Sequence, residues 1–285
     1  FPPLPMPFLP PSSPDDPNFG HLLEPLEEQV LATGAFIREE RISFQSKNIE
    51  VKGANDFVSY VDRTAEEQLA ARCEQLLPGA NLLLEEGGTT TTDSPWTWII
   101  DPLDGTTNFI HNVPVFAISL GLQYQGETVL GLIYEVNNRE LFRAIRGTGA
   151  YLNGEAIHSS PQQDFGQSLM ATGFPFRAIR DVDAYLGLLR EFMTNVRGIR
   201  RLGSAAVDLA FVACGRFEGF FESRLKPWDV AAGELLVREA GGRVTDYRGG
   251  TDHVHGGNIA ASNGPLHADM LRLIQAYSDF QPPVQ

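Results

Sequence analysis

Hydrophobic residues near the start of the chain recur at helical spacing. The apolar residues Leu22, Leu26, Val30, Leu31, Ile37 and Phe44 lie between positions 21 and 46, and they recur at roughly helical spacing. A second helical pattern begins near Asp62 and continues through Leu76. It stops at Pro78-Gly79, a common signal for the end of a helix. We therefore expect two successive helices in this region.

The middle of the chain changes to short apolar runs that are typical of strands. They are NLLLEE (81–86), WTWII (96–100), FAISLGLQY (116–124), ETVLGLIYEV (127–136) and ELFRAI (140–145). Gln125-Gly126 and Asn137-Asn138 separate the last three runs, and such dipeptides suit tight hairpin turns. This section predicts an antiparallel sheet.

Beyond about residue 160, strand-like and helix-like segments alternate. Strands are expected at SLMATG (168–173), GIRRL (198–202), FEGFFE (217–222) and NIAAS (258–262). Helices are expected at 181–194, at 204–214 with Ser204 as N-cap, at 228–240 up to Gly241-Gly242, and from about Pro265. This alternation indicates an α/β half. We predict an N-terminal α+β half with the metal site at 21–157 and a C-terminal α/β half at 158–285 that completes the pocket.

The first 17 positions contain eight prolines, which predicts a disordered tail over residues 1–20. This tail has no positive n-region and makes a poor signal peptide. The sequence has no run of 18 apolar residues, so no membrane span is expected. Cys73 and Cys214 are interpreted as free thiols, which fits a reducing, cytoplasmic compartment. The plastid stroma remains an alternative, with the tail as a remnant of a targeting segment.

The composition, 42% hydrophobic and 20% charged, is that of a soluble globular protein. The net charge of −14 disfavours a nucleic-acid binder, which would show a basic surface. An anionic substrate would therefore need local cations or a metal.

Two acids end the apolar strand in WTWIIDPLDGTTNF (96–109). Pro102 restricts the backbone and Gly105 permits a sharp turn, so Asp101 and Asp104 can face one point with the Leu103 carbonyl between them. Mg²⁺ prefers such oxygen ligands. The alternative is that the two acids only cap a turn or a helix. A helix starting at Gly105-Thr106-Thr107 would favour an anion, above all phosphate, at its N-terminus.

Other candidates have plain structural alternatives. Glu85, Asp62 and Asp229 each lie at the end of a predicted strand or the start of a predicted helix, where an acid often serves as a cap or a surface residue. His111 is interpreted as a structural histidine rather than a general acid. His253 and His255 lack an evident third zinc ligand. GTGAYLNG (147–154) follows a hairpin instead of opening a helix, so it fails as a dinucleotide loop. Arg200-Arg201 either contacts substrate or partner, or forms a salt-bridged strand edge.

Several segments together resemble the inositol monophosphatase family. LEEGG (84–88), WIIDPLDGTTNF (98–109) and KPWDVAAGELLVREAGG (226–242) are similar to its three signature regions. KGANDFVSYVD (52–62), GFPFR (173–177) and RRLGSAAVDLA (200–210) resemble its bacterial and plastid-type branch. The resemblance extends from about residue 22 to residue 277.

The resemblance implies a five-layered α-β-α-β-α sandwich, of mixed α+β and α/β character, that forms a homodimer inhibited by lithium. It implies two or three Mg²⁺ per subunit, with the ligands Glu85, Glu86, Asp101, Leu103 (through its carbonyl), Asp104 and Asp229. The catalytic residues that it implies are Glu85, Thr106 and Asp62, which activate or orient the attacking water. The implied substrate-binding residues are Asp104, Gly105, Thr106, Gly203, Ser204, Ala205, Glu222 and Asp229.

From these patterns we expect a Mg²⁺-dependent phosphate monoester hydrolase that uses metal-activated water, with inositol 1-phosphate as first choice of substrate. The alternatives on the same fold are histidinol phosphate, fructose 1,6-bisphosphate and nucleotide 3′-phosphate. Glu222 favours a small phosphorylated polyol because a carboxylate accepts hydrogen bonds from neighbouring hydroxyls. A second class is a regulatory, protein-binding role, since members of the bacterial branch are associated with the transcription machinery. We expect neither direct nucleic-acid nor membrane binding.

Overall fold

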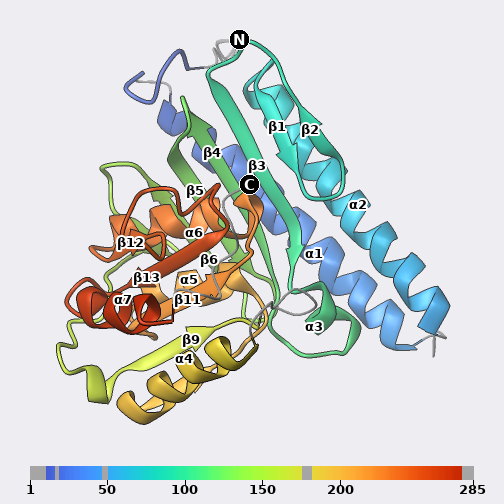
Figure 1. Cartoon of the computed structure of the whole chain (residues 1–285). Coiled ribbons are helices and arrows are strands. Elements are labelled where there is room, and N and C mark those ends of the chain that lie inside the picture. The colour runs from blue at the N-terminus through green and yellow to red at the C-terminus, as the bar shows by residue number, and fades with distance from the viewer. Residues whose placement is uncertain (1–10, 17–18, 47–50, 175–181, 278–285) are drawn as a thin grey trace, which may run out of the picture.

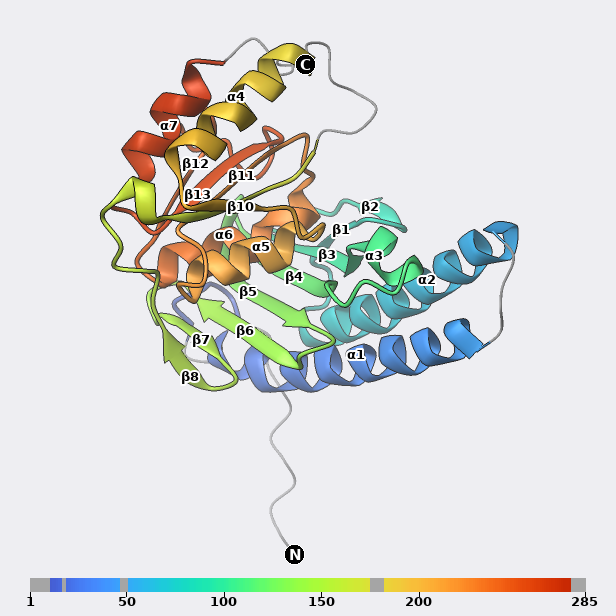
Figure 2. The ribbon, with the colours of Figure 1, turned by 90° about the horizontal axis from the view of Figure 1, so that it is seen from below.

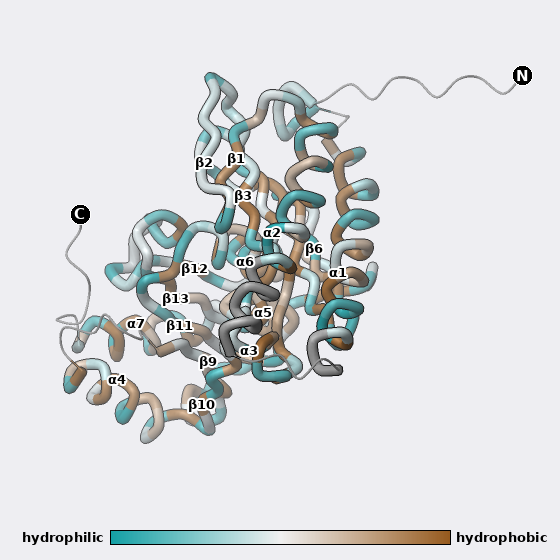
Figure 3. Tube along the Cα trace, turned by 90° about the vertical axis from the view of Figure 1, so that its right-hand side faces the viewer, coloured by the Kyte–Doolittle hydropathy of each residue, from teal (hydrophilic) through white to brown (hydrophobic). Residues whose placement is uncertain are grey.

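The elements of the chain stack in five layers, α-β-α-β-α, which confirms the expected sandwich (Figures 1 and 2). A computed structural model describes residues 11–16, 19–46, 51–174 and 182–277. Three hydrophobic cores fill the spaces between the layers. The outer helices alternate hydrophobic and hydrophilic positions along their turns, as expected for helices with one face packed on a sheet (Figure 3).

The first layer consists of α1 (Leu23–Ser46) and α2 (Val51–Leu76). The prediction that α2 begins near Asp62 was wrong, because the helical backbone extends back to Val51. The buried stripe of α2 runs through Val61, Ala65, Leu69 and Cys73 at helical spacing. Asp62 therefore lies well inside a helix and is not an N-cap.

The second layer is an eight-stranded sheet in the order β2-β1-β3-β4-β5-β6-β7-β8. Its strands are β1 (Asn81–Leu84), β2 (Gly88–Thr90), β3 (Trp96–Asp104), β4 (Ala117–Tyr124), β5 (Glu127–Glu135), β6 (Glu140–Ile145), β7 (Ala150–Leu152) and β8 (Glu155–Ile157). Gln125 and Gly126 both have positive φ, of 52° and 85°, as a tight hairpin turn requires. The predicted antiparallel arrangement holds except for β1 and β3, which pair in parallel.

The remaining layers come from the second half of the chain. The middle layer contains α5 (Ala205–Ala213) and α6 (Pro227–Glu239). The second sheet has the order β10-β9-β11-β13-β12; its strands are β9 (Leu169–Thr172), β10 (Gly198–Arg200), β11 (Gly219–Ser223), β12 (Arg243–Thr245) and β13 (Asn258–Ser262). The last layer is α4 (Val182–Asn195) and α7 (His267–Gln275). The single turn η2 (Phe165–Gln167) precedes β9.

The proposed boundary near residue 158 falls between the two sheets. Helices α5 and α6, from beyond that boundary, pack on the eight-stranded sheet as well as on the second sheet. The two halves of the chain therefore share a core. No helix among the described residues is both long and apolar enough to cross a membrane.

Part of the predicted proline-rich tail packs on the body of the protein. Phe19, in the single turn η1 (Phe19–Leu22), is buried, and its ring stacks on Trp96 with the centroids 5.8 Å apart. Residues 1–10 and 17–18 of the tail lie outside the described residues.

Candidate metal and phosphate site

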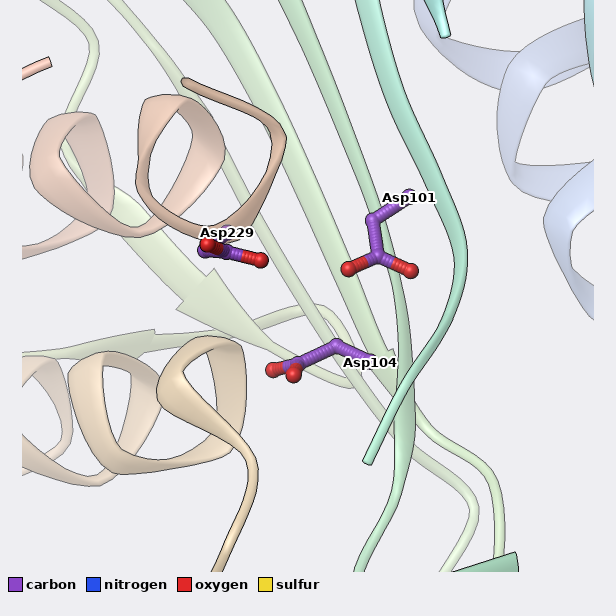
Figure 4. Close-up of side chains that lie close together, drawn as sticks. All are labelled: Asp101, Asp104 and Asp229. Atoms are coloured by element: carbon purple, nitrogen blue, oxygen red, sulfur yellow. The ribbon is translucent and has the colours of Figure 1, made fainter. Parts of the chain in front are cut away.

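The two acids of the DPLDG motif lie at the end of β3, where its pairing with β4 shifts register between Asp101 and Asp104. In a regular strand, residues three apart point to opposite faces. The irregularity removes that constraint, and the carboxylates of Asp101 and Asp104 come together with that of Asp229 from α6 (Figure 4). Ligand oxygens of these three residues lie within 4.8 Å of one another. Residues from two distant parts of the chain thus form one acidic cluster.

Local hydrogen bonds hold each member of this cluster. The Leu103 N–H donates to Oδ1 of Asp101 at 2.9 Å. One oxygen of Asp104 accepts the Ser204 hydroxyl and the Ala206 N–H, both at 2.7 Å. One oxygen of Asp229 accepts the Lys226 N–H at 2.6 Å, as in a helix cap. Since a carboxylate has two oxygens, the capping bonds leave Asp104 and Asp229 able to bind a cation.

The parallel pairing of β1 with β3 brings Glu85 beside Asp101. The Glu85 N–H donates to the Ile100 carbonyl at 3.3 Å, and burial followed by the charge of Glu85 raises the pKa of the neighbouring Asp101 carboxyl group. Together they line a cavity of about 790 Å³. Its lining residues are Glu85, Asp101, Leu103, Asp104, Gly105, Thr106, Thr107, Arg201, Gly203 and Asp229.

Burial raises the pKa of every acid in this group, and repulsion from neighbouring carboxylates adds to the increase at Glu85, Asp101 and Asp229. The pKa of Glu85 rises to about 7 and that of Asp104 to about 6, in both cases chiefly through burial. The pKa of Asp101 and of Asp229 lies well above the usual range, through burial and then the neighbouring carboxylates. A divalent cation would remove this repulsion. The donor set of carboxylates and the Leu103 carbonyl consists of oxygen atoms, which suits Mg²⁺.

A second group of acids lies on α2, next to the Glu85–Gly88 turn. Asp62 is buried, and its Oδ1 accepts no hydrogen bond from the described part of the chain. Burial, followed by the charges of Glu86 and Glu85, raises its pKa to about 8. Glu66, one helical turn later, accepts the Glu86 N–H at 2.9 Å. Glu66 was not among the residues predicted from the sequence, although its spacing from Asp62 places both acids on one helix face.

The predicted phosphate-binding turn borders the same cavity. Gly105 has a φ of 97° and precedes α3 (Thr106–Ile110). The Thr106 hydroxyl donates to the Leu103 carbonyl at 3.1 Å, which links it to one of the predicted metal ligands. Thr107, the third residue of the predicted helix start, also lines the cavity. Arg201, left with two interpretations above, faces the cavity.

The predicted polyol-binding residues occupy different positions around this cavity. Gly203 lines it. Ser204 caps α5 as predicted, accepting the Val207 N–H at 3.3 Å, and Ala205 begins that helix. Both are buried and lie outside the lining set, so their contact with substrate stays a prediction.

Glu222 of β11 lies against Gly173: a Cβ on that glycine would come 1.9 Å from the Glu222 carboxyl group. Burial, followed by the charge of Asp104, raises the pKa of Glu222 to about 8, and Arg201 opposes that shift. Asp208 of α5, which was not predicted from the sequence, is a buried acid near Glu222, Asp104 and Arg201.

The two histidine candidates, His111 and His253, lie outside the acidic cluster. His111 is exposed at the end of α3. Nε2 of His253 lies 3.4 Å from the carboxylate of Glu234, and the described residues show no clustering of His253 with other metal-binding side chains.

The GTG loop (147–149) binds a carboxylate of the protein itself. The N–H groups of Gly147 and Gly149 both donate to Glu239 at 2.9 Å, so the loop resembles an anion site already filled. Of the GFPFR segment, residues 175–177 lie outside the described residues.

The chain is similar to known proteins over most of its length. The model of the inositol monophosphatase family matches residues 21–279. Nus factor SuhB of Escherichia coli (strain K12) is 46% identical over 221 residues, which is 77% of this chain and 83% of that protein. An inositol-1-monophosphatase of Mesorhizobium japonicum is 39% identical over 255 residues, covering 89% of this chain and 96% of the relative.

Solved structures show the same similarity. The extragenic suppressor protein suhB from Bartonella henselae has a TM-score of 0.83 at 39% identity, covering 90% of this chain and 98% of that one. An inositol monophosphatase from Anabaena has a TM-score of 0.80 at 34% identity, covering 94% and 98%.

Proposed function

The chain belongs to the inositol monophosphatase family, and from that premise we propose that it is a Mg²⁺-dependent phosphate monoester hydrolase with inositol 1-phosphate as its preferred substrate. The observation that carries this proposal is the convergence of Asp101, Asp104 and Asp229 beside Glu85, at the edge of a cavity bordered by Gly105 and Thr106. A reaction on a phosphate monoester needs large barrier reduction, because uncatalysed hydrolysis is among the slowest biological reactions.

The acidic side chains are the proposed metal ligands. Glu85, Asp101, the Leu103 carbonyl, Asp104 and Asp229 would hold two Mg²⁺, and Glu86 would support a third, weaker site. When bound, Mg²⁺ supplies Lewis-acid polarisation of phosphoryl oxygens and lowers the pKa of a bound water.

The remaining residues orient the attacking water, accept its proton and bind the substrate. Thr106 and Asp62 orient the attacking water, and Glu85 takes up or steers its proton. The backbone N–H groups of Gly105 and Thr106 hold the phosphate. Gly203, Ser204, Ala205 and Glu222 face the polyol, whose hydroxyls donate to the carboxylate oxygens of Glu222.

Turnover of four esters in the presence of Mg²⁺ tests the substrate. We expect inositol 1-phosphate to be hydrolysed faster than histidinol phosphate, fructose 1,6-bisphosphate and a nucleotide 3′-phosphate. A clear preference for histidinol phosphate would show that the substrate choice is wrong.

Replacing Asp104 by Asn (D104N) tests the mechanism. The amide removes one negative ligand while keeping the shape of the side chain, so we expect activity to fall by at least about a hundredfold, together with Mg²⁺ affinity. The proposed homodimer should persist, which size-exclusion chromatography with light scattering measures. Full activity in D104N would refute the metal mechanism.

A regulatory role is a second candidate, because relatives 46% identical to this chain are named Nus factor SuhB. The acidic net charge of −14 favours a protein partner over direct nucleic-acid contact. D104N in cells separates the two functions. A cellular function that survives the loss of phosphatase activity supports the protein-binding role, and one that disappears supports catalysis.

A further inference from the structure

Asn108 connects the loop at Val115 to the loop at Leu202. It lies on α3, two residues after Thr106, and is 8% exposed. Its side-chain amide donates to the Val115 carbonyl at 2.7 Å and to the Leu202 carbonyl at 2.8 Å. The second bond joins residues 94 apart in the sequence, one before and one after the proposed boundary.

The loop held by Asn108 carries several residues of the site. Leu202 lies between Arg201 and Gly203, both of which line the cavity. Directly afterwards, the Ser204 hydroxyl and the Ala206 N–H bind Asp104 at 2.7 Å each. The position of the Leu202 carbonyl therefore influences both the cavity wall and the start of α5.

The two loops are in close contact. A Cβ on Gly105 would lie 3.0 Å from the Val115 carbonyl oxygen and 3.3 Å from that of Gly203. A Cβ on Gly203 would lie 3.0 Å from the Asn108 amide nitrogen. Both glycines have φ above 90°, a conformation that other residues rarely adopt. The junction is therefore tightly packed, by backbone and the Phe116 Cβ around Gly105 and by side chains around Gly203.

Helix α3 depends on such contacts for its position. It has five residues, and its N-cap, Gly105, supplies no side-chain hydrogen bond. A helix of this length is unstable in isolation. Asn108 supplies two side-chain bonds that tie α3 to the neighbouring backbone.

From this geometry we propose that Asn108 is a positioning residue, which holds the Arg201–Ser204 loop against the Gly105–Thr107 turn and so sets the fit of the alcohol part of the substrate. This inference rests on the proposed function. Asp104 keeps its own bonds to Ser204 and Ala206. Loss of the Asn108 bridge therefore weakens polyol binding more than phosphate binding or the chemical step.

Two variants and a matched control test the bridge. Asn108→Ala removes both bonds, while Asn108→Asp keeps the size of the side chain and replaces the donor by a carboxylate that accepts only. The control is Asn263→Ala. Asn263 is also buried, and its amide also donates to two carbonyls, those of Ser160 and Gln162, at 2.9 and 2.8 Å. It lies outside the cavity lining.

Hydrogen exchange of the metal-free proteins reports the coupling without any need for activity. We expect the amides of residues 201–207 to exchange about tenfold faster in both Asn108 variants, since local protection depends on the lost bonds. Asn263→Ala should leave them unchanged and loosen residues 159–163 instead. Unchanged exchange at 201–207 in the Asn108 variants, or equal loosening in the control, would overturn the proposal.

Kinetics with Mg²⁺ then test the consequence for substrate. In the Asn108 variants we expect the KM for inositol 1-phosphate to rise about tenfold, with kcat and the inhibition constant of inorganic phosphate within about threefold of wild type. A fall in kcat at unchanged KM, or phosphate inhibition weakened in step with KM, would refute the positioning role. If the wild-type protein hydrolyses none of the four esters, the proposed function fails, while hydrogen exchange still decides whether Asn108 couples the loops.

Discussion

At the scale of single residues, acids of the site accept capping hydrogen bonds and also belong to the acidic cluster, two positions that the sequence left as alternatives. Asp229 accepts the Lys226 N–H as a cap and also joins the cluster with Asp101 and Asp104. Asp104 accepts two bonds from the start of α5 while lying at the cavity. Both roles coexist because each ionised carboxylate offers two oxygens and about four lone pairs.

Replacing Gly173 by Ala should disturb Glu222. The added methyl group would lie 1.9 Å from the Glu222 carboxyl group, so that side chain must move. We expect a loss of stability of about 1–3 kcal/mol, typical of overpacking, and weaker binding of inositol 1-phosphate. Chemical denaturation and KM measure these effects. If the free energy of unfolding and KM both stayed at their wild-type values, the Glu222 side chain would not be confined by Gly173.

At the scale of elements, the position of α6 depends on glycines in the eight-stranded sheet. A Cβ on Gly131 of β5 would lie 2.8 Å from the Ala232 carbonyl oxygen and 3.0 Å from the Ala232 Cα. A Cβ on Gly121 of β4 would lie 3.1 Å from the Ala231 Cβ, a milder contact. Helix α6 therefore packs directly on the strand backbones, and this close packing brings Asp229 to the end of β3.

Gly131→Ala should displace α6 and Asp229 together. Because the clash is with backbone, we expect a loss of about 1–3 kcal/mol of stability and reduced Mg²⁺ affinity, measured by denaturation and calorimetric titration. Gly121→Ala serves as the graded comparison and should have a smaller effect on both. Equal effects of the two changes, or unchanged Mg²⁺ affinity in Gly131→Ala, would contradict this account of how Asp229 is placed.

At the scale of the whole molecule, the fold concentrates acids whose charged forms are unfavourable without a cation. Asp62 and Glu222 have pKa values of about 8 and Glu85 of about 7, whereas unfolded carboxyl groups ionise near pH 4. Between these values the folded protein binds more protons than the unfolded one. Its stability therefore falls as pH rises.

We expect the melting temperature of the metal-free protein to decrease from pH 6.5 to pH 8, and the increase caused by Mg²⁺ to be largest at pH 8. His267 acts in the opposite direction at lower pH. Burial lowers its pKa to about 4, so stability is lost as pH falls below the unfolded value of about 6.5. Differential scanning calorimetry with and without Mg²⁺ measures both trends. A melting temperature that is constant or rising between pH 6.5 and 8 without metal would show that the pKa values of these buried acids are not raised in the folded protein.

Local features of this protein follow from the sequence alone. The helical and strand periods, the Gln125-Gly126 turn, the Ser204 cap and the placement of Asp101 and Asp104 at a strand end all depend on neighbouring residues. Their physical basis is local backbone conformation and the burial of one face, so a pattern over a few residues is sufficient. The motifs also indicated the family and its five layers.

Only the tertiary structure determined which of these segments come into contact. The parallel pairing of β1 with β3 places Glu85 beside Asp101, and α2 brings Glu66 to the Glu86 N–H. Asn108 reaches Leu202, and Glu239 fills the glycine loop at 147–149. The start of α2 at Val51 likewise departed from the local pattern. These outcomes depend on strand register and helix packing between segments far apart in the chain, and no short stretch of sequence specifies them.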